Sequence, residues 1–206
     1  METPTDISPL TLNRLSVYLR VLRILEAEGL RHVSSRQLAE RFELSSAQIR
    51  KDLAHFGELG VRGVGYDVSK LANRLHEVLR LDRRHSLLVV GVGNLGSALC
   101  SYLGFNDSSF RVVAGVDSDP NRHGAPVGNI RVQPLEELET IVASHNIDIA
   151  VLTVPPEAAL SAHDRLVAAG VKAILNFAAT QLPRHDEVRV KNVDFRMFLE
   201  ELAFYG

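Results

Sequence analysis

Apolar residues recur at three- and four-residue steps through the first third of the chain, which is the period of amphipathic helices. A Ser-Pro start signal at residues 8 and 9 precedes a leucine stripe that ends near Gly29. Two shorter helical patterns begin at Ser34 and Ser45, and each has a glutamine three residues later, the spacing of a capping box. Because only a short turn separates these two helices, the pattern predicts a helix-turn-helix.

A glycine-rich stretch at 57–68 follows, and it predicts a hairpin rather than a helix. A further helix is expected at 69–80. From residue 86 the pattern changes to short apolar runs that alternate with helical segments, which indicates a doubly wound parallel sheet. The expected strands are 87–92, 110–117, 147–155, 171–177 and 188–195, and the expected helices are 95–103, 134–145, 156–169 and 196–206.

The expected architecture is therefore α/β, with two domains and a terminal helix. Residues 1–84 form a winged-helix (helix-turn-helix) domain, residues 85–194 a Rossmann-type doubly wound parallel sheet, and residues 195–206 a C-terminal helix. The length of 206 residues gives each domain enough chain to bury its own core.

Composition changes this picture little. Hydrophobic residues make up 46% and charged residues 23% of the chain, as in an ordinary globular protein. No apolar run reaches 18 residues, and the first residues lack the design of a signal peptide, so we expect no membrane span and a cytoplasmic location. The single cysteine, Cys100, permits no intrachain disulfide and is expected to be a buried thiol.

The formal charge is unevenly distributed. Residues 1–85 hold 14 Lys and Arg against 11 Asp and Glu, whereas residues 86–206 hold 9 against 14. Because the positive excess is modest, what matters is whether the cations share one element. Arg50 and Lys51 do, since they are neighbours on the third helix, on the side opposite its apolar positions.

In a helix-turn-helix the second helix enters the major groove, where Arg and Lys reach O6 and N7 of guanine. We therefore predict that Arg50 and Lys51 contact DNA, and that Arg62 does so from the hairpin, where a wing would lie. The other predicted DNA-binding residues are Ser46, Gln48 and Gly63. A solvated helix face with three ordinary cations is the alternative.

The stretch "VVGVGNLGSAL" at 89–99 follows an apolar strand and opens a helix of small residues. In a dinucleotide-binding loop, Gly91 permits the tight turn, Gly93 the approach of a pyrophosphate, and Gly96 close helix–strand packing. Asp117 ends the next strand, where a carboxylate accepts a hydrogen bond from a ribose 2′-hydroxyl. A 2′-phosphate would meet a like charge there, so the sequence favours NAD(H) over NADP(H).

Further cofactor-binding residues are predicted in the same loop and after neighbouring strands. Ligands of doubly wound sheets bind at the carboxyl ends of the strands. The additional residues are Val92, Asn94 and Leu95 in the loop, Thr153, Val154 and Pro155 after one strand, and Asn176 and Phe177 after the next.

No catalytic group accompanies this cofactor in the sequence. Tyr66 and Lys70 have the Y-x-x-x-K spacing of short-chain dehydrogenases, but they precede the glycine loop and lie outside its domain, so we interpret the match as coincidence. The eight histidines show no metal-ligand spacing, and no metal site is expected. Too few residues follow the last strand for a substrate domain. We therefore predict a protein that is not an enzyme.

Three stretches carry a family resemblance: "SSAQIRKDLAHFGELGVRGVGYDV", "VVGVGNLGSAL", and "NFA" with "KNVDF". From about residue 8 to 206 the chain resembles the Rex family of bacterial redox-sensing transcriptional repressors. The resemblance implies a winged-helix DNA-binding domain, an NAD(H)-binding Rossmann domain, and a homodimer whose C-terminal helices are domain-swapped. One departure is visible, since the family often has proline where this chain has Ala179, beside the nicotinamide pocket.

The resemblance also implies roles for single residues. Tyr102 matches a tyrosine placed near the nicotinamide, and Arg20 and Asp194 match a pair whose contact differs between DNA-bound and released forms. Phe195 and Phe198 belong to the swapped helix. The apolar surface of that helix independently predicts dimerisation, with docking on its own domain as the alternative.

Together these features predict a repressor that senses the ratio of NADH to NAD⁺. It would bind a pseudo-palindromic operator in double-stranded DNA as a homodimer and release it when NADH binds. Two alternatives stay open. One is a regulator linked to coenzyme A, because Rossmann domains of this type hold coenzyme A in related proteins, and the other is a small NAD-dependent oxidoreductase.

Overall fold

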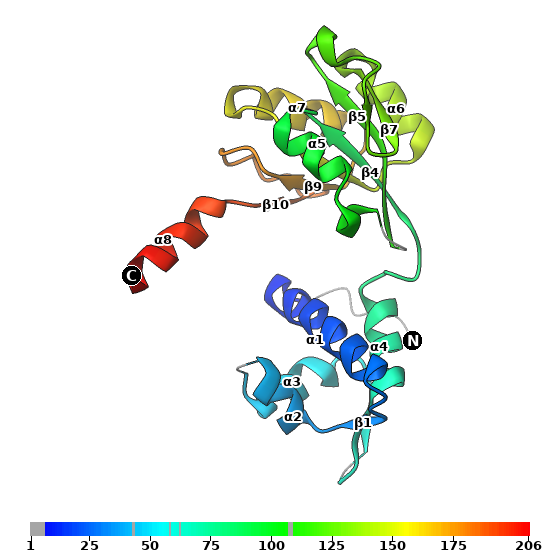
Figure 1. The fold of residues 1–206 in the computed structure, drawn as a ribbon, viewed down its shortest axis with the longest axis vertical. Helices are drawn as coiled ribbons and strands as arrows, with labels where there is room; N and C mark the ends of the chain where they lie inside the picture. Colours follow the sequence, from blue (N-terminus) through cyan, green and yellow to red (C-terminus); the bar gives the residue numbers. More distant parts are fainter. Residues whose placement is uncertain (1–6, 43, 58, 62, 107–108) are drawn as a thin grey trace. The chain divides into compact units, whose positions relative to one another are not determined.

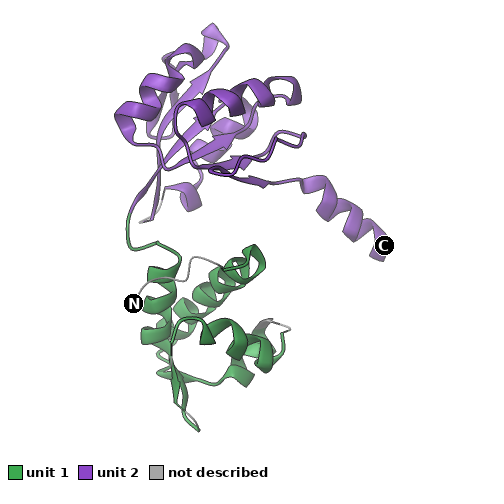
Figure 2. Cartoon of the chain, turned by 180° about the vertical axis from the view of Figure 1, so that it is seen from behind, with its two compact units in different colours: residues 1–83 green, residues 84–206 purple. Residues whose placement is uncertain are grey.

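The structure, a computed structural model, describes residues 7–42, 44–57, 59–61, 63–106 and 109–206. The chain divides into two compact units, residues 1–83 (unit 1) and 84–206 (unit 2), which Figure 2 colours separately. The boundary lies one residue before the expected one. Each unit has its own apolar core and is described by itself.

Unit 1 combines a helical core with a small antiparallel sheet of order β1-β3-β2 (Figure 1). Its elements are α1 (Pro9–Ala27), β1 (His32–Val33), α2 (Ser35–Phe42), α3 (Ser46–Ala54), β2 (Gly60–Val61), β3 (Gly65–Asp67) and α4 (Val68–Val78). The leucine stripe of α1 packs into the core with Leu38 of α2, Ile49 and Leu53 of α3, and Leu71 of α4. The predicted helix-turn-helix is confirmed.

Local capping explains where the two helices of this motif begin. Ser34 and Gln37 form a complete capping box, because the Gln37 N–H donates to Ser34 Oγ at 3.1 Å and the Ser34 N–H donates to Gln37 Oε1 at 2.9 Å. Ser45 accepts from the Gln48 N–H at 3.1 Å, but the Gln48 side chain does not return to Ser45. The second box is therefore only half formed.

The glycine-rich stretch forms the predicted hairpin through β2 and β3, and a third strand joins it. His32 and Val33 pair with the outer side of β3, a contact that the sequence did not predict. Gly65 has φ +98°, and a Cβ there would lie 2.6 Å from the Val33 carbonyl oxygen. Only glycine fits where the hairpin passes this close to β1.

Unit 2 contains a seven-stranded sheet of order β10-β9-β8-β4-β5-β7-β6, in which β6 alone is antiparallel. Its strands are β4 (His85–Val90), β5 (Phe110–Asp117), β6 (Pro126–Val127), β7 (Ile130–Pro134), β8 (Ile149–Leu152), β9 (Ala173–Asn176) and β10 (Arg189–Asn192). Its helices are α5 (Asn94–Cys100), η1 (Leu103–Phe105), η2 (Pro120–Arg122), η3 (Leu135–Glu137), α6 (Leu138–His145), α7 (Pro156–Ala168) and α8 (Phe195–Tyr205). The predicted doubly wound sheet is confirmed, and β6 and β7 extend it beyond the expected strands.

Helices cover both faces of this sheet (Figure 1). Leu88 and Val90 of β4 join one apolar cluster with α6 and α7, whereas Leu87 and Val89 join a second cluster with Cys100 of α5. This arrangement explains the continuous apolar run of β4, because both of its faces are buried. It also leaves the carboxyl end of β4, at the sheet centre, as the place where the glycine loop begins.

Candidate functional site

The glycine loop joins β4 to α5 and requires glycine for packing. Gly91 has φ +90°, and a Cβ there would lie 2.8 Å from Val154 Cγ1. A Cβ at Gly96 would overlap the carbonyl oxygen of Gly91, whereas one at Gly93 would meet nothing within 4 Å. Gly91 and Gly96 are thus required by the fold itself. Gly93 leaves open space before the first turn of α5, and the approach of a pyrophosphate to it stays a prediction.

Thr153, directly after β8, ties that strand end to the loop. Its hydroxyl donates to the Gly91 carbonyl oxygen at 2.6 Å, and its N–H donates to the Val90 carbonyl oxygen at 2.9 Å. The carboxyl ends of β4 and β8 therefore meet at one edge of the sheet, where ligands of this fold class bind.

Asp117 ends β5 and is buried at the same edge. Its Oδ2 accepts from the Val92 N–H at 2.7 Å, and its Oδ1 accepts from the Asp119 N–H at 2.8 Å. The carboxylate therefore holds the glycine loop in shape. Each carboxylate oxygen accepts more than one hydrogen bond, so these contacts leave capacity for a ribose hydroxyl, and that contact stays a prediction.

A cavity of about 610 Å³ opens over this edge. The predicted cofactor residues that line it are Gly91, Gly93, Leu95, Asp117, Thr153, Val154, Pro155 and Phe177. Those outside its lining are Val92, Asn94, Gly96, Asn176 and Tyr102. Its volume is within the range of small-molecule and cofactor sites.

Two of these outlying residues contact neighbouring protein groups in this structure. Asn176 is fully buried, and its amide donates to the Thr180 carbonyl oxygen and to Asn192 Oδ1, both at 2.9 Å. It therefore holds the chain after β9 and joins it to β10. Tyr102 is exposed and packs edge-on against Phe105, so its place near a nicotinamide stays a prediction.

Two arginines that were not predicted from the sequence, Arg122 and Arg165, line the cavity. Arg122 Nη1 donates to the Val92 carbonyl oxygen at 2.9 Å. Arg165 forms two hydrogen bonds to Glu139, at 2.6 and 2.7 Å, and these lower the pKa of the Glu139 carboxyl to about 2. Each guanidinium is also paired with a carboxylate, Arg122 with Asp119 at 3.6 Å and Arg165 with Glu139 at 2.6 Å. The "DPNR" run shortly after Asp117 was a signal for Arg122, whereas Arg165 lies in α7, far along the chain.

The surface of α3 in unit 1 presents the predicted cations. Arg50 and Lys51 are exposed, and Arg50 donates to Ser35 Oγ at 3.1 Å. Ser46 is half-buried at the start of α3. Their contacts with DNA stay predictions.

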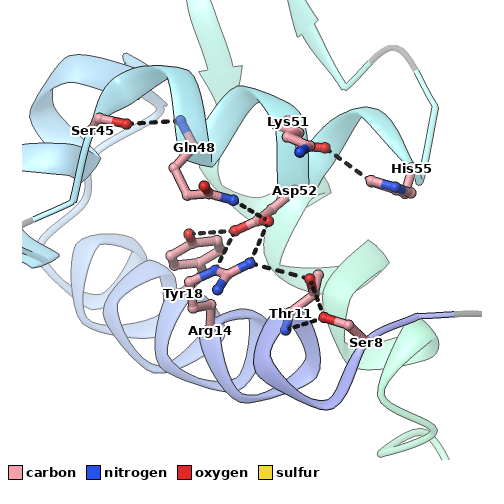
Figure 3. Close-up of polar contacts among 9 residues, drawn as sticks. All are labelled: Ser8, Thr11, Arg14, Tyr18, Ser45, Gln48, Lys51, Asp52 and His55. Carbon is pink, nitrogen blue, oxygen red and sulfur yellow. Dashed lines mark hydrogen bonds and ion pairs between the residues drawn. The ribbon is translucent and has the colours of Figure 1, made fainter.

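The remaining predicted DNA-binding residues lie in α3 and the hairpin. Gln48 turns its amide to Asp52, to which it donates at 2.9 Å, so in this structure it faces a neighbour on its own helix (Figure 3). Gly63, at the hairpin tip, has φ +83° and is exposed. Arg62 lies outside the described residues.

Helix α8 extends away from the sheet of unit 2, and all of its side chains are exposed (Figure 1). Apart from a ring contact at its first residue, α8 therefore does not dock on its own domain, the alternative considered above. Phe195, at the start of α8, packs against Phe177 of the cavity with ring centroids 6.0 Å apart. Asp194 caps α8 by accepting from the Arg196 N–H at 2.9 Å, and Arg20 is an exposed residue of α1. Their pairing stays a prediction.

Other reactive groups do not belong to this site. Cys100 is buried, and burial raises the pKa of its thiol to about 11, so the thiol stays protonated near neutral pH. Tyr66 and Lys70 belong to unit 1, whereas the glycine loop belongs to unit 2. Within the described ranges, His, Cys, Asp and Glu side chains form no group of three or more suited to a metal ion. Among the described helices, none combines the length and apolar character needed to cross a membrane.

Curated relatives match almost the whole chain. It is 45% identical over 194 residues to the redox-sensing transcriptional repressor Rex of Carboxydothermus hydrogenoformans, covering 94% of this chain and 93% of the relative. It is 47% identical over 195 residues to the repressor of the same name from Syntrophomonas wolfei, covering 95% and 93%.

Solved structures match equally far. The crystal structure of RSP, a Rex-family repressor, in complex with β-NAD⁺ and operator DNA aligns with a TM-score of 0.93 at 35% identity, covering 98% of this chain and 93% of that one. The complex of RSP with β-NADH aligns with a TM-score of 0.89 at 34% identity, covering 98% and 94%.

Two family models divide the chain much as the structure does. A model described as "Putative DNA-binding protein N-terminus" matches residues 6–54, and one described as "CoA binding domain" matches residues 82–180. The first covers the helix-turn-helix, and the second covers the glycine loop with strands β4 to β9 of the sheet. With relatives this similar over nearly its full length, the chain belongs to the Rex family of redox-sensing transcriptional repressors.

Proposed function

We propose that this chain is a repressor that binds a pseudo-palindromic operator as a homodimer and releases it when NADH binds. The observation that carries the proposal is the combination, in one chain, of exposed cations on a helix-turn-helix and a glycine-loop cavity. The complexes of RSP with β-NAD⁺ and operator DNA, and with β-NADH, support it by similarity. We place the protein in the cytoplasm, where its operator DNA would also lie.

The cavity residues fit a dinucleotide. The open space at Gly93 would admit a pyrophosphate, and Asp117 would accept from a ribose hydroxyl. Arg122 would add a positive charge near the phosphates or the ribose. NADH supplies a neutral dihydronicotinamide where NAD⁺ has a charged ring, so the residues that tell the two apart must lie at that end of the ligand.

Phe177 connects this cavity to the dimer helix. Its ring lines the cavity and contacts Phe195 at the start of α8. A nicotinamide that displaced Phe177 would therefore disturb α8. In the proposed homodimer, α8 buries its apolar surface on the partner subunit, and Arg20 and Asp194 pair in one of the two states.

Switching requires unequal binding to the two states of the dimer. A ligand moves such an equilibrium only by its differential affinity, and about 5.5 kcal/mol is needed to carry it from 1:99 to 99:1. Tight binding of NAD⁺ alone would therefore not release the operator. No turnover is needed, and we propose that the protein is a regulator and not an enzyme.

The test begins with a pool of randomised palindromic duplexes enriched on the dimer. Fluorescence anisotropy then follows the enriched duplex at fixed salt, because salt alone changes protein–DNA affinity strongly. We expect NADH to release the DNA while NAD⁺ at the same concentration leaves it bound. Release by both nucleotides, or by neither, would contradict the proposal.

The match to a coenzyme A binding domain favours a second candidate, a regulator that responds to coenzyme A. The same titration with coenzyme A separates the two. Release of the operator by coenzyme A with no effect of NADH would establish the second candidate. Oxidation of NADH that depends on an added substrate would instead indicate an oxidoreductase.

A further inference from the structure

Helix α3 carries one buried charged side chain, Asp52, next to the exposed pair Arg50 and Lys51. Asp52 is 2% exposed, and among the described residues of unit 1 it is the only buried residue with a charge. Its carboxylate points from α3 to α1, away from the exposed face of α3 (Figure 3). A charge in this position is costly unless it is fully hydrogen-bonded.

Four donors satisfy the two carboxylate oxygens. From α1, Arg14 donates through Nε to Oδ2 at 2.7 Å and through Nη2 to Oδ1 at 2.8 Å, and the Tyr18 hydroxyl donates to Oδ2 at 2.9 Å. From α3 itself, Gln48 Nε2 donates to Oδ1 at 2.9 Å. We call Arg14, Tyr18, Gln48 and Asp52 the Asp52 cluster. It links the first half of α1 to the middle of α3.

The protonation state of the cluster is set by these bonds. Burial raises the pKa of the Asp52 carboxyl, but the hydrogen bonds from Arg14, Tyr18 and Gln48 outweigh burial and hold that pKa below its usual range. Burial, together with the bond to Asp52, raises the pKa of the Tyr18 phenol. At neutral pH the cluster is therefore an ionised carboxylate between a guanidinium and a neutral phenol.

Stability alone does not explain such a cluster. A buried ion pair can often be replaced by apolar residues of similar volume without loss of stability. The distinct property of the Asp52 cluster is that its bonds are directional, because a bidentate guanidinium–carboxylate pair fixes both the distance and the orientation of its two partners. The neighbouring core contacts of Ile49 and Leu53 are apolar, and apolar attraction is non-directional.

Direction matters because of what adjoins Asp52. Arg50 and Lys51 precede it on the same helix, and successive residues of an α-helix project at fixed angles to one another. Fixing the rotation of α3 at Asp52 therefore fixes where Arg50 and Lys51 point. Base readout depends on this, since a guanine offers its acceptors only at defined positions in the groove.

We propose that Asp52 is a positioning residue for operator reading. It holds α3 in one rotation and one register against α1, so that the side chains of Arg50 and Lys51 meet the operator in a fixed geometry. Gln48 serves the same cluster instead of reading a base. This inference rests on the proposed function, because it takes α3 as the helix that reads DNA.

The test compares the full-length wild-type dimer with Asp52→Asn. The asparagine keeps the shape of the side chain, but it has no charge and only one acceptor oxygen for the donors of Arg14 and Tyr18. We expect operator affinity to fall at least about ten-fold while affinity for a non-specific duplex at the same salt changes less than about two-fold. NADH affinity should stay unchanged, since the substitution lies in the other unit.

Two matched controls separate position from charge. Glu77→Gln removes an exposed carboxylate that pairs with Arg74 on α4 at 3.0 Å, and it should leave both DNA affinities as in the wild type. Asp52→Glu retains the charge and should recover part of the operator affinity lost in Asp52→Asn. If Asp52→Glu lost as much operator affinity as Asp52→Asn, or if Glu77→Gln lost as much, the role of the Asp52 carboxylate would be contradicted.

A double variant keeps the test decisive if Asp52→Asn unfolds. Arg14→Met with Asp52→Leu replaces the ion pair with apolar side chains, and circular dichroism with thermal unfolding verifies its fold. We expect it to lose operator affinity and to keep non-specific affinity. A folded variant that retains wild-type preference for the operator would overturn the inference. A wild-type dimer that selects no operator would refute the proposed function itself. That outcome differs from a double variant that keeps its operator preference, which would refute only the role of Asp52.

Discussion

Helix α3 in unit 1 and the glycine loop in unit 2 are both held against neighbouring elements, but by different groups. Side chains fix α3, through the hydrogen bonds that converge on the buried Asp52. The glycine loop is held mainly by its own backbone, through the close approach of Gly91 and Gly96, and the Asp117 carboxylate adds a bond to one of its amides. The first presents long cations to solvent, and the second presents its own backbone to a cavity.

The difference teaches where each site tolerates change. A site built from projecting side chains can lose one of them and keep its fold, so substitutions there should act on affinity and sequence preference. A site built from a tight backbone turn has no room for an added atom, so substitutions there should act on fold and function together. Variants at the two sites therefore test the comparison directly.

The largest effect is expected from Gly96→Ala. Its Cβ would overlap the Gly91 carbonyl oxygen, so α5 must shift away from the loop. Overpacking of this kind costs about 1–3 kcal/mol or more, and we expect the thermal midpoint to fall and NADH affinity to drop at least about 100-fold. Thermal unfolding and isothermal titration with NADH measure the two effects.

Gly93→Ala is the matched control, because a Cβ at that position meets nothing within 4 Å. This variant should unfold at the wild-type temperature and lose NADH affinity only through contact with the ligand. If the thermal midpoint fell for both Gly96→Ala and Gly93→Ala, the assignment of Gly96 to packing and of Gly93 to ligand approach would be wrong.

The next effect is expected from Lys51→Ala on the exposed face of α3. Loss of a guanine contact should cost roughly 1–3 kcal/mol of operator affinity and relax the preference at one operator position. The thermal midpoint should not move, since Lys51 is exposed. Anisotropy with a set of single-base operator variants measures this. An equal loss for all sequences would mean that Lys51 contacts a phosphate.

Asp117→Ala is expected to have an effect of similar size, on the affinity for the nucleotide. It removes the acceptor for the Val92 and Asp119 amides, so the loop loosens, and a lost hydrogen bond of this kind costs about 1–3 kcal/mol when the donor stays buried. NADH should bind more weakly, and the preference for NADH over NADPH should narrow. Titrations with both nucleotides provide the ratio, and an unchanged ratio would remove Asp117 from the ribose site.

The smallest effect is expected from Glu139→Gln, beside the cavity. Because Arg165 lowers the pKa of Glu139 to about 2, the pair stabilises the fold above the ordinary carboxyl pKa of 4.5, and this contribution is lost as pH falls toward 2. Exposed pairs contribute under about 1 kcal/mol, so the variant should only flatten the loss of stability in acid. Denaturant unfolding between about pH 6 and 3 measures the slope. A large loss at neutral pH would contradict the small contribution expected of this exposed pair.

Sequence alone predicted the features that rest on local pattern. The leucine stripe of α1 marks a helix because its period is long and regular, and the run before Gly91 marks a central strand because both faces are apolar. The spacing of Gly91, Gly93 and Gly96 then identified the turn, since each position has a distinct steric demand.

Features that depend on tertiary contact were not predicted. Strand β1 has two residues and no pattern of its own, and it forms because the hairpin passes beside it. Strand β6 went unpredicted for a similar reason, since it is equally short. The direction of the Gln48 amide depends on Asp52, and the entry of Arg165 into the cavity depends on the packing of α7.

Helix α8 has a thermodynamic consequence for the whole protein. Its phenylalanines and leucines are solvated in a single chain, and burial on a second copy would make part of the folding free energy a function of concentration. The melting temperature of the protein should therefore rise as its concentration rises. When the dimer dissociates on dilution, the apolar surface of α8 is exposed to solvent. Dissociated subunits are therefore prone to aggregate. The concentration of the protein in the cell would thus help to set the stability of each folded subunit.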